Sequence, residues 1–125
     1  MTAFTLLLLS FLAITFLQSG YDKIVDWNGN VSWLKEHFSN TLLKNKVPAA
    51  LLTVLALEIA AGVLGIMGIV ENLINQSTVL ANYCCVVSSV TLLLLLFGQR
   101  LAKDYDGART IVIYLIPALL GVYWL

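Results

Sequence analysis

Apolar residues form four long blocks along this chain, separated by shorter polar segments. A helix needs about 20 apolar residues to cross the hydrocarbon core of a bilayer, and three of the blocks approach or exceed that length. The fourth ends in Tyr123 and Trp124, which favour the membrane–water interface. The pattern predicts an all-α membrane protein, a single domain over residues 1–125 with four transmembrane helices in one bundle. The blocks are Ala3–Gly20, Ala49–Val70, Val79–Gly98 and Thr110–Leu125.

Composition agrees with this class. Of the 125 residues, 60% are hydrophobic and 11% are charged, and so few charges do not cover the core of a small soluble domain. The first block has an alternative reading as a secretory signal peptide, because small residues follow its apolar core. It lacks a basic segment at its start and an A-x-A-like cleavage site. We therefore interpret it as the first membrane helix.

Basic residues gather in the first and third connections between the blocks. The second connection, residues 71–78, contains none, and neither does either end of the chain. Lys and Arg favour the cytoplasmic side of a membrane. We therefore expect residues 21–47 and 99–109 to be cytoplasmic and the N- and C-termini to be periplasmic. The basic residues are Lys23, Lys35, Lys44, Lys46, Arg100, Lys103 and Arg109.

The first connection is longer than the roughly 2 to 8 residues that usually join neighbouring helices of a bundle. Its segment "DWNGN" is typical of a turn. After this segment, apolar positions recur at helical spacing. They predict an amphipathic helix at the cytoplasmic interface, within the loop 21–47, with Trp27 and Trp33 at headgroup level. The stripe consists of Val31, Leu34, Phe38, Thr41 and Leu42.

One charged residue, Glu58, lies near the middle of the second block. A carboxylate at the centre of a membrane helix costs about 2.5 to 3.5 kcal/mol on insertion scales, which the many Leu, Ile and Val residues of the block offset. Residues three, four and seven positions later share its helical face, and these are Ala61, Gly62 and Gly65. Small residues allow another helix to approach closely. We therefore expect Glu58 to face the bundle and these three residues to serve helix packing.

Several polar groups lie at the predicted depth of Glu58. We expect its partners among Ser10, Ser88, Ser89 and a backbone carbonyl freed by Pro117. With no cation at that depth, one interpretation is a neutral acid that donates a hydrogen bond to Ser89 or to a carbonyl. The other is functional, since ionisable groups inside membranes often carry protons or anchor ligands.

A second polar cluster lies at the predicted cytoplasmic ends of the helices. One interpretation is interfacial anchoring and ion pairing. The alternative is a site for an anionic head group or a quinone head between the helix ends. The cluster consists of Gln18, Ser19, Asp22, Lys23, Gln99, Arg100, Asp104 and Arg109.

Other chemistry finds little support in the sequence. His37 is the only histidine, which excludes bis-His haem ligation within the chain, and we interpret it as a solvated loop residue. Cys84 and Cys85 are adjacent, a spacing that fits neither a redox pair nor a zinc site, so we assign them to packing. No catalytic residue, metal-ligand set or nucleotide-binding loop can be assembled, and no cofactor is evident beyond the quinone alternative.

Three segments carry a family resemblance: "QSGYDKIVDW" at the end of the first block and beyond it, "LEIAAGVLGIMG" in the second block, and "FGQRLAKDYDGA" at the end of the third block and beyond it. With them the chain resembles the DoxX-like family of small four-helix bacterial membrane proteins. The family's S-G-x-x-K pattern falls on Ser19, Gly20 and Lys23, and its E-x-x-x-G pattern on Glu58 and Gly62. The long first loop with its Trp pair has no match in characterised members, which leaves partner and substrate open.

The resemblance implies a compact bundle in the bacterial inner membrane, where family members are linked to redox complexes, including quinone-coupled ones. The first functional hypothesis is a non-catalytic accessory subunit of a larger membrane assembly, docked through small-residue faces. The alternative is a stand-alone binder of a quinone or lipid-like ligand, or a proton-coupled carrier that uses Glu58. The expected partners are the lipid bilayer and other membrane-protein subunits, and no nucleic acid.

Overall fold

The structure is a computed structural model that describes residues 2–42 and 45–125. Lys44, one of the basic residues counted above, lies outside these ranges. Four of the helices in the described ranges are long and apolar enough to span a membrane. This confirms the predicted all-α class with four spanning helices. The helices are α1 (Thr2–Val25), α2 (Trp27–His37), α3 (Val47–Asn75), α4 (Val79–Leu101) and α5 (Tyr105–Trp124).

Each spanning helix extends beyond its apolar block into polar residues. α1 continues to Val25 instead of ending at Gly20, and α5 begins at Tyr105 instead of Thr110. α3 and α4 also continue past their blocks. A helix ends where its backbone hydrogen bonds end, and a polar side chain does not by itself break them. Hydropathy therefore identifies the membrane-crossing part of each helix but not its full length.

Local backbone features set several helix ends. Pro48 lies in the first turn of α3, where its missing N–H breaks no helical hydrogen bond. Gln76 adopts the left-handed conformation, with φ of 53°, and ends α3. Asp104 caps α5, because its Oδ1 accepts a hydrogen bond from Gly107 N at 3.0 Å. The neighbouring Lys103 has φ of 60°, so the α4–α5 link is a tight turn.

The short helix α2 begins earlier than the sequence indicated. The predicted turn at "DWNGN" is confined to Asp26, which separates α1 from α2, and the rest of the segment is the first turn of α2. Asn30 bonds twice to the Asp26 carbonyl, through its backbone N at 2.9 Å and its side-chain Nδ2 at 2.7 Å. Residues that favour turns also favour the first positions of a helix, and this segment takes the second role.

One face of α2 lies against the bundle. Val31, Leu34 and Phe38 are half-buried, which agrees with the predicted apolar stripe. Leu42 belongs to that predicted stripe but follows the helix and is 84% exposed, so its assignment was wrong. No residue of α2 is fully buried. This helix therefore covers the bundle without becoming part of its core.

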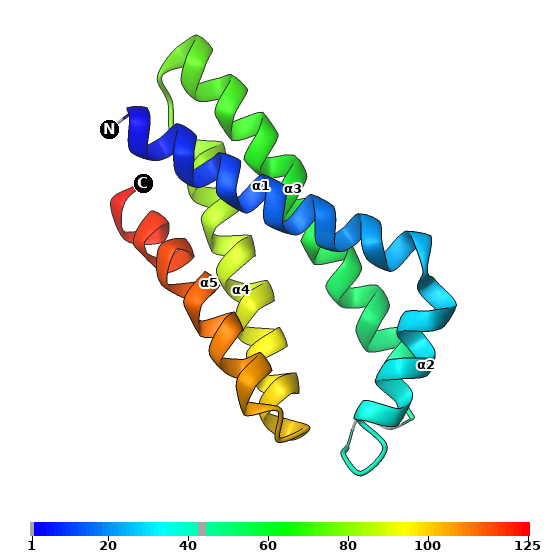
Figure 1. The fold of residues 1–125 in the computed structure, drawn as a ribbon. Coiled ribbons are helices and arrows are strands. Elements are labelled where there is room, and N and C mark those ends of the chain that lie inside the picture. The colour runs from blue at the N-terminus through cyan, green and yellow to red at the C-terminus, as the bar shows by residue number, and fades with distance from the viewer. Residues whose placement is uncertain (1, 43–44) are drawn as a thin grey trace.

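The bundle is built from three extended pairings, α1 with α3, α3 with α4 and α4 with α5. Figure 1 shows both chain termini at the same end of the bundle as the α3–α4 connection. We call this the terminal end. α2 and the α4–α5 link lie at the opposite end, which we call the loop end. α1 crosses over α3 and leads away from α4 and α5 as it approaches the loop end, where α2 follows.

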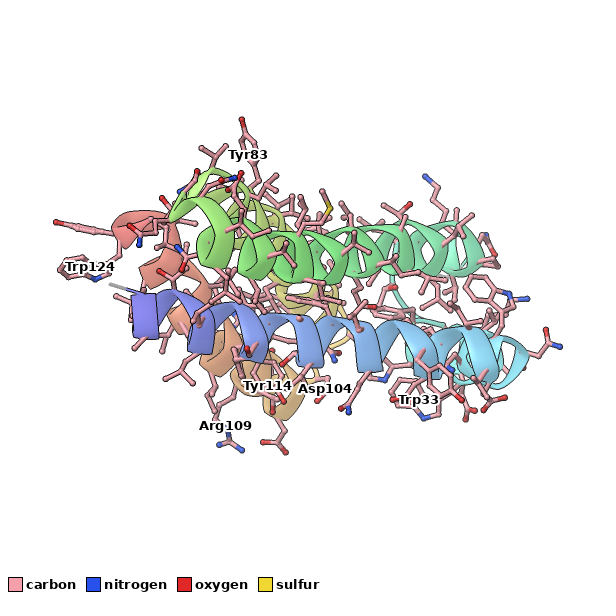
Figure 2. The ribbon with its side chains drawn as sticks, turned by 90° about the horizontal axis from the view of Figure 1, so that it is seen from above. Trp33, Tyr83, Asp104, Arg109, Tyr114 and Trp124 are labelled. Carbon is pink, nitrogen blue, oxygen red and sulfur yellow. The ribbon has the colours of Figure 1, made fainter. Side chains whose placement is uncertain are left out.

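The outer surface of the four long helices is apolar. Large side chains such as Leu7, Ile66, Leu93 and Ile116 are about half exposed or more, so the bundle presents a hydrocarbon surface to lipid. Aromatic residues occur at both ends, with Trp33 at the loop end and Tyr83 and Trp124 at the terminal end (Figure 2). Interfacial aromatic residues of membrane proteins have this distribution. The lipid bilayer is therefore the environment of this chain.

Glycines on α3 bring three helices into close contact. A Cβ on Gly65 would lie 3.3 Å from the Leu9 carbonyl oxygen of α1. A Cβ on Gly68 would lie 3.1 Å from the Ala81 backbone N of α4. Both neighbours are backbone atoms, which move less easily than the end of a side chain. The bundle core therefore depends on small residues at these positions.

We predict that Gly68→Ala destabilises the bundle whereas Gly98→Ala does not. Both glycines lie within helices, so both changes gain the same helix propensity. A Cβ on Gly98 would make an ordinary contact of 3.7 Å with the Phe38 ring, whereas one on Gly68 crowds the α4 backbone. We expect a difference of about 1 to 3 kcal/mol in unfolding free energy, measured by thermal unfolding in mild detergent. Equal stability of the two variants would contradict the close approach of α3 and α4.

Candidate functional site

The buried carboxylate of Glu58 has a cation beside it. Glu58 of α3 is 2% exposed, and its Oε1 lies 2.9 Å from Lys23 Nζ of α1. The Lys23 side chain is 18% exposed. No cation was expected at this depth from the sequence, and that expectation was wrong. Glu58 and Lys23 form an ion pair between two membrane helices.

The position of Lys23 follows from the spacing of buried residues on α1. Leu9, Leu12, Phe16 and Gly20 are buried at intervals of three or four residues, which is the repeat of one helical face. Lys23 is the next position in this series. It therefore extends the face that packs on α3, and its long side chain carries the ammonium back toward Glu58.

Two glycines flank the ion pair and hold the helices close. Gly20 of α1 faces the side chains of Leu55 and Ile59. Gly62 of α3 faces Leu17, which a Cβ at this position would overlap. Because α1 and α3 approach on both sides of Glu58, the ammonium spans the gap from one helix to the other. The segments that carry the S-G-x-x-K and E-x-x-x-G patterns therefore meet at one place.

The ion pair has hydrogen bonds on one side only. Lys23 Nζ donates a hydrogen bond to Ser19 Oγ at 2.7 Å. Ser19 lies one helical turn before Lys23 on α1, so this bond holds the ammonium against its own helix. The contact with Glu58 is close, but its angles are not those of a hydrogen bond, and Oε1 has no hydrogen-bond donor among the described residues. Charge attraction in a region of low dielectric therefore holds the carboxylate.

The serines expected to bind Glu58 bond elsewhere. Ser10 Oγ donates to the Leu6 carbonyl at 2.7 Å, and Ser89 Oγ donates to the Cys85 carbonyl at 2.8 Å. Ser88 Oγ lies 3.9 Å from Cys84 Sγ. Hydroxyl groups in membrane helices commonly bond the carbonyl one turn before them. The expectation that Ser89 pairs with Glu58 was therefore wrong.

The packing candidates Ala61, Gly62 and Gly65 are all buried. Cys84 Sγ donates to the Ala61 carbonyl at 3.3 Å, so Ala61 contacts α4 while the two glycines contact α1. Cys84 and Cys85 are themselves buried free thiols. These small faces are filled by neighbouring helices of the same chain.

The predicted polar cluster divides into separate groups. Ser19 and Lys23 belong to the ion-pair site, while Gln18 and Asp22 are exposed. Arg109 pairs with Asp106 at 2.9 Å on an exposed surface. Arg100 stacks on the Tyr105 ring at 5.1 Å. The structure therefore does not join the cluster into one site.

Gln99 and Asp104 form a third group with His37. His37 Nε2 lies 3.2 Å from Gln99 Oε1 and 3.7 Å from Asp104 Oδ2. The His37 ring stacks on Trp33, with 4.6 Å between ring centroids, and its side chain is only 18% exposed. The interpretation of His37 as a solvated loop residue was wrong. Its position three residues after Leu34, on the half-buried face of α2, is the signal that could have placed it there.

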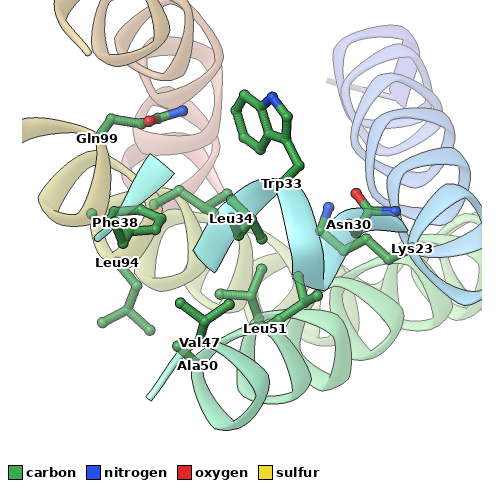
Figure 3. A pocket seen from close by; sticks show the side chains of 13 residues that line it. Lys23, Asn30, Trp33, Leu34, Phe38, Val47, Ala50, Leu51, Leu94 and Gln99 are labelled. Carbon is green, nitrogen blue, oxygen red and sulfur yellow. The ribbon is translucent and has the colours of Figure 1, made fainter. Parts of the chain in front are cut away.

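An apolar pocket of about 290 Å³ lies between α2, α3 and α4 at the loop end. Leu34 of α2 and Phe38, which follows it directly after the helix, line it on one side, and Leu51 of α3 and Leu94 of α4 line it on others. Figure 3 shows Lys23 and Asn30 next to each other at one side of the pocket and Gln99 at another. The pocket arises because α1 and α4 diverge toward this end and α2 covers the opening without filling it.

The ammonium of Lys23 connects the pocket to the buried carboxylate. Lys23 lines the pocket, and its Nζ is 2.9 Å from Glu58 Oε1. A ligand head in the pocket would therefore contact one member of the ion pair. In the described ranges, no group of three or more His, Cys, Asp or Glu side chains is arranged to hold a metal ion. The site offers charge, hydrogen-bond donors and an apolar wall.

Comparisons of the chain with protein-family models, curated proteins and solved structures found no match.

We predict that Lys23→Met lowers the unfolding free energy by about 3 kcal/mol, because it leaves a buried carboxylate without its cation. The double variant Lys23→Met/Glu58→Gln should recover most of this loss, because no unmatched charge remains. Thermal unfolding in mild detergent measures both.

Arg109→Met is the matched control for this prediction. Its ion pair with Asp106 has the same length of 2.9 Å, but the two side chains are 74% and 90% exposed. Exposed pairs contribute little, so this change should leave stability nearly unaltered. Equal losses of unfolding free energy for Lys23→Met and Arg109→Met would show that burial does not increase the contribution of the Lys23–Glu58 pair to stability.

Proposed function

We propose that this integral membrane protein binds an amphipathic molecule from the bilayer in the loop-end pocket. The observation that carries the proposal is an apolar pocket with one ammonium at its edge. Its volume, about 290 Å³, is close to the lower end of the roughly 300 to 1,000 Å³ of known ligand pockets. Apolar walls with a few polar groups are typical of such sites. A lipid-like molecule or a quinone has the matching shape.

The resemblance to DoxX-like proteins belongs to the same proposal. Its two site motifs contribute Ser19 and Lys23 from α1 and Glu58 from α3, and these side chains are in contact. Contact between the motifs supports treating them as one functional unit. With that resemblance we place the protein in the bacterial inner membrane.

The rival function is a non-catalytic accessory subunit of a larger redox assembly. That hypothesis used the small-residue faces as docking surfaces for other subunits. Gly62, Gly65 and Gly68 instead contact helices of this chain, so they are already occupied. The pocket is a feature that an accessory role does not require. We therefore favour ligand binding, with co-purifying subunits and no bound amphiphile as the outcome that would overturn it.

The test is extraction of the tagged protein from its native membrane in mild detergent, followed by mass spectrometry of everything that stays bound. We expect a bound amphiphile in stoichiometric amount. Ala50→Phe fills the pocket from α3 and should abolish this binding. Ala56→Phe makes the same change at an exposed position of α3 and should retain it. Stoichiometric membrane subunits without a bound amphiphile would support the accessory role.

Orientation in the membrane is a second part of the proposal. The basic residues of the described ranges lie in or beside α2, the end of α1 and the α4–α5 link, and these elements form the loop end. By the distribution of Lys and Arg, the loop end faces the cytoplasm and the termini face the periplasm.

A reporter enzyme that is active only in the periplasm tests this orientation. Fused after Leu125, it should be active, and fused after Lys103 it should be inactive. A fluorescent protein that folds only in the cytoplasm should give the opposite result at both positions. If the periplasmic reporter were active when fused after Lys103 and inactive when fused after Leu125, the assigned topology would be reversed.

A further inference from the structure

We infer that the pocket selects a ligand whose head is uncharged and accepts hydrogen bonds, and that the Lys23–Glu58 ion pair sets this selectivity. The inference rests on the proposed function, because it concerns the ligand of the same pocket. It defines the ligand as a bilayer amphiphile with an oxygen acceptor in its head and no net charge. Anionic lipids and fatty acid carboxylates are excluded as the preferred occupants.

The charge at the pocket edge is already matched. Of the side chains that line the pocket in the described part of the chain, Lys23 alone is charged. A free ammonium there would attract an anionic head, as basic side chains at membrane surfaces do. Glu58 Oε1, however, lies 2.9 Å from the ammonium. Lys23 and Glu58 together have no net charge.

An anionic head at Lys23 would place two negative groups beside one ammonium. Glu58 is 2% exposed and has no other cation within salt-bridge distance among the described residues. Water therefore does little to screen its repulsion of a second anion. The other nearby anion, Asp104, lies beside His37. Like charges in contact reduce binding strongly, so the buried carboxylate repels anionic heads from the pocket.

Hydrogen-bond donors remain for a neutral head. An ammonium has three N–H donors, and Ser19 Oγ accepts one of them at 2.7 Å. Asn30 Nδ2 donates to the Asp26 carbonyl at 2.7 Å, which leaves its second N–H. Figure 3 shows Lys23 and Asn30 together at one side of the pocket. A carbonyl or hydroxyl oxygen of a ligand can accept from this pair without displacing Glu58.

The test compares two amphiphiles that share one brominated chain, a monoacylglycerol and the corresponding fatty acid. The second is used at pH 9, where its carboxyl group is ionised. The protein is placed in lipid nanodiscs, with Trp27 and Trp124 replaced by Phe. Trp33 lines the pocket, so quenching of its fluorescence reports occupancy. Binding is the saturable part of the quenching, which Ala50→Phe should abolish.

We expect the wild-type protein to bind the monoacylglycerol at least about tenfold more tightly than the carboxylate. Glu58→Gln removes the repelling charge and leaves Lys23 unmatched, so it should reverse the preference. Lys23→Met/Glu58→Gln leaves no charge at the site and should bind both ligands with similar affinity.

The outcomes separate this inference from the proposed function. Saturable binding with equal or tighter affinity for the carboxylate in the wild-type protein overturns the inference and leaves the pocket as a binding site. Saturable binding of neither ligand overturns both. If Glu58→Gln does not fold, the comparison of the two ligands in the wild-type protein still tests the inference.

Discussion

A carboxylate inside a membrane bundle needs a counter-charge within reach, and the structure of this chain depends on how α1 and α3 supply one. Gly20 and Gly62 bring the two helices together on either side of Glu58, and Lys23 extends across the gap. Without the close approach, the ammonium would lie in the polar region at the helix end. The ion pair therefore depends on the packing of the two backbones, because the glycines set how closely the helices approach and so whether Lys23 reaches Glu58.

The same crossing of α1 and α3 accounts for the pocket. α1 packs on α3 and leads away from α4 at the loop end, so the spanning helices alone would leave an open gap there. α2 covers it with half-buried side chains and one polar anchor, His37. Because α2 has no fully buried residue, an internal volume remains beneath it, whereas another long helix at this place would fill that volume. The pocket and the short helix have a common origin in the divergence of the spanning helices.

The sequence predicts the class of this protein well because hydropathy and helix length determine it. The four spanning helices, the inward face of Glu58 and the stripe of Val31, Leu34 and Phe38 follow from residue spacing alone. The partner of Glu58 was missed because Lys23 follows the end of the first apolar block and was therefore expected at the cytoplasmic end of its helix. The repeat of buried positions on α1 extends to Lys23 and would have corrected this.

His37 and the segment at Trp27 were missed for a different reason. Asn and Gly favour turns and helix starts alike, and only tertiary packing decides between them. A lone histidine in a polar segment carries no signal of burial until its stacking on Trp33 is considered. Pocket residues from α2, α3 and α4 are far apart in the sequence, and no pattern within one segment relates them.

The two ends of the bundle differ in how closely their helices pack. At the terminal end, Glu71 Oε1 accepts a hydrogen bond from Leu80 N at 3.0 Å, and Gly68 packs on the α4 backbone, so α3 holds the start of α4 through contacts with its backbone. The loop end has a cover with no fully buried residue. Separation of α2 from the bundle would therefore expose less buried surface than separation of α3 from α4.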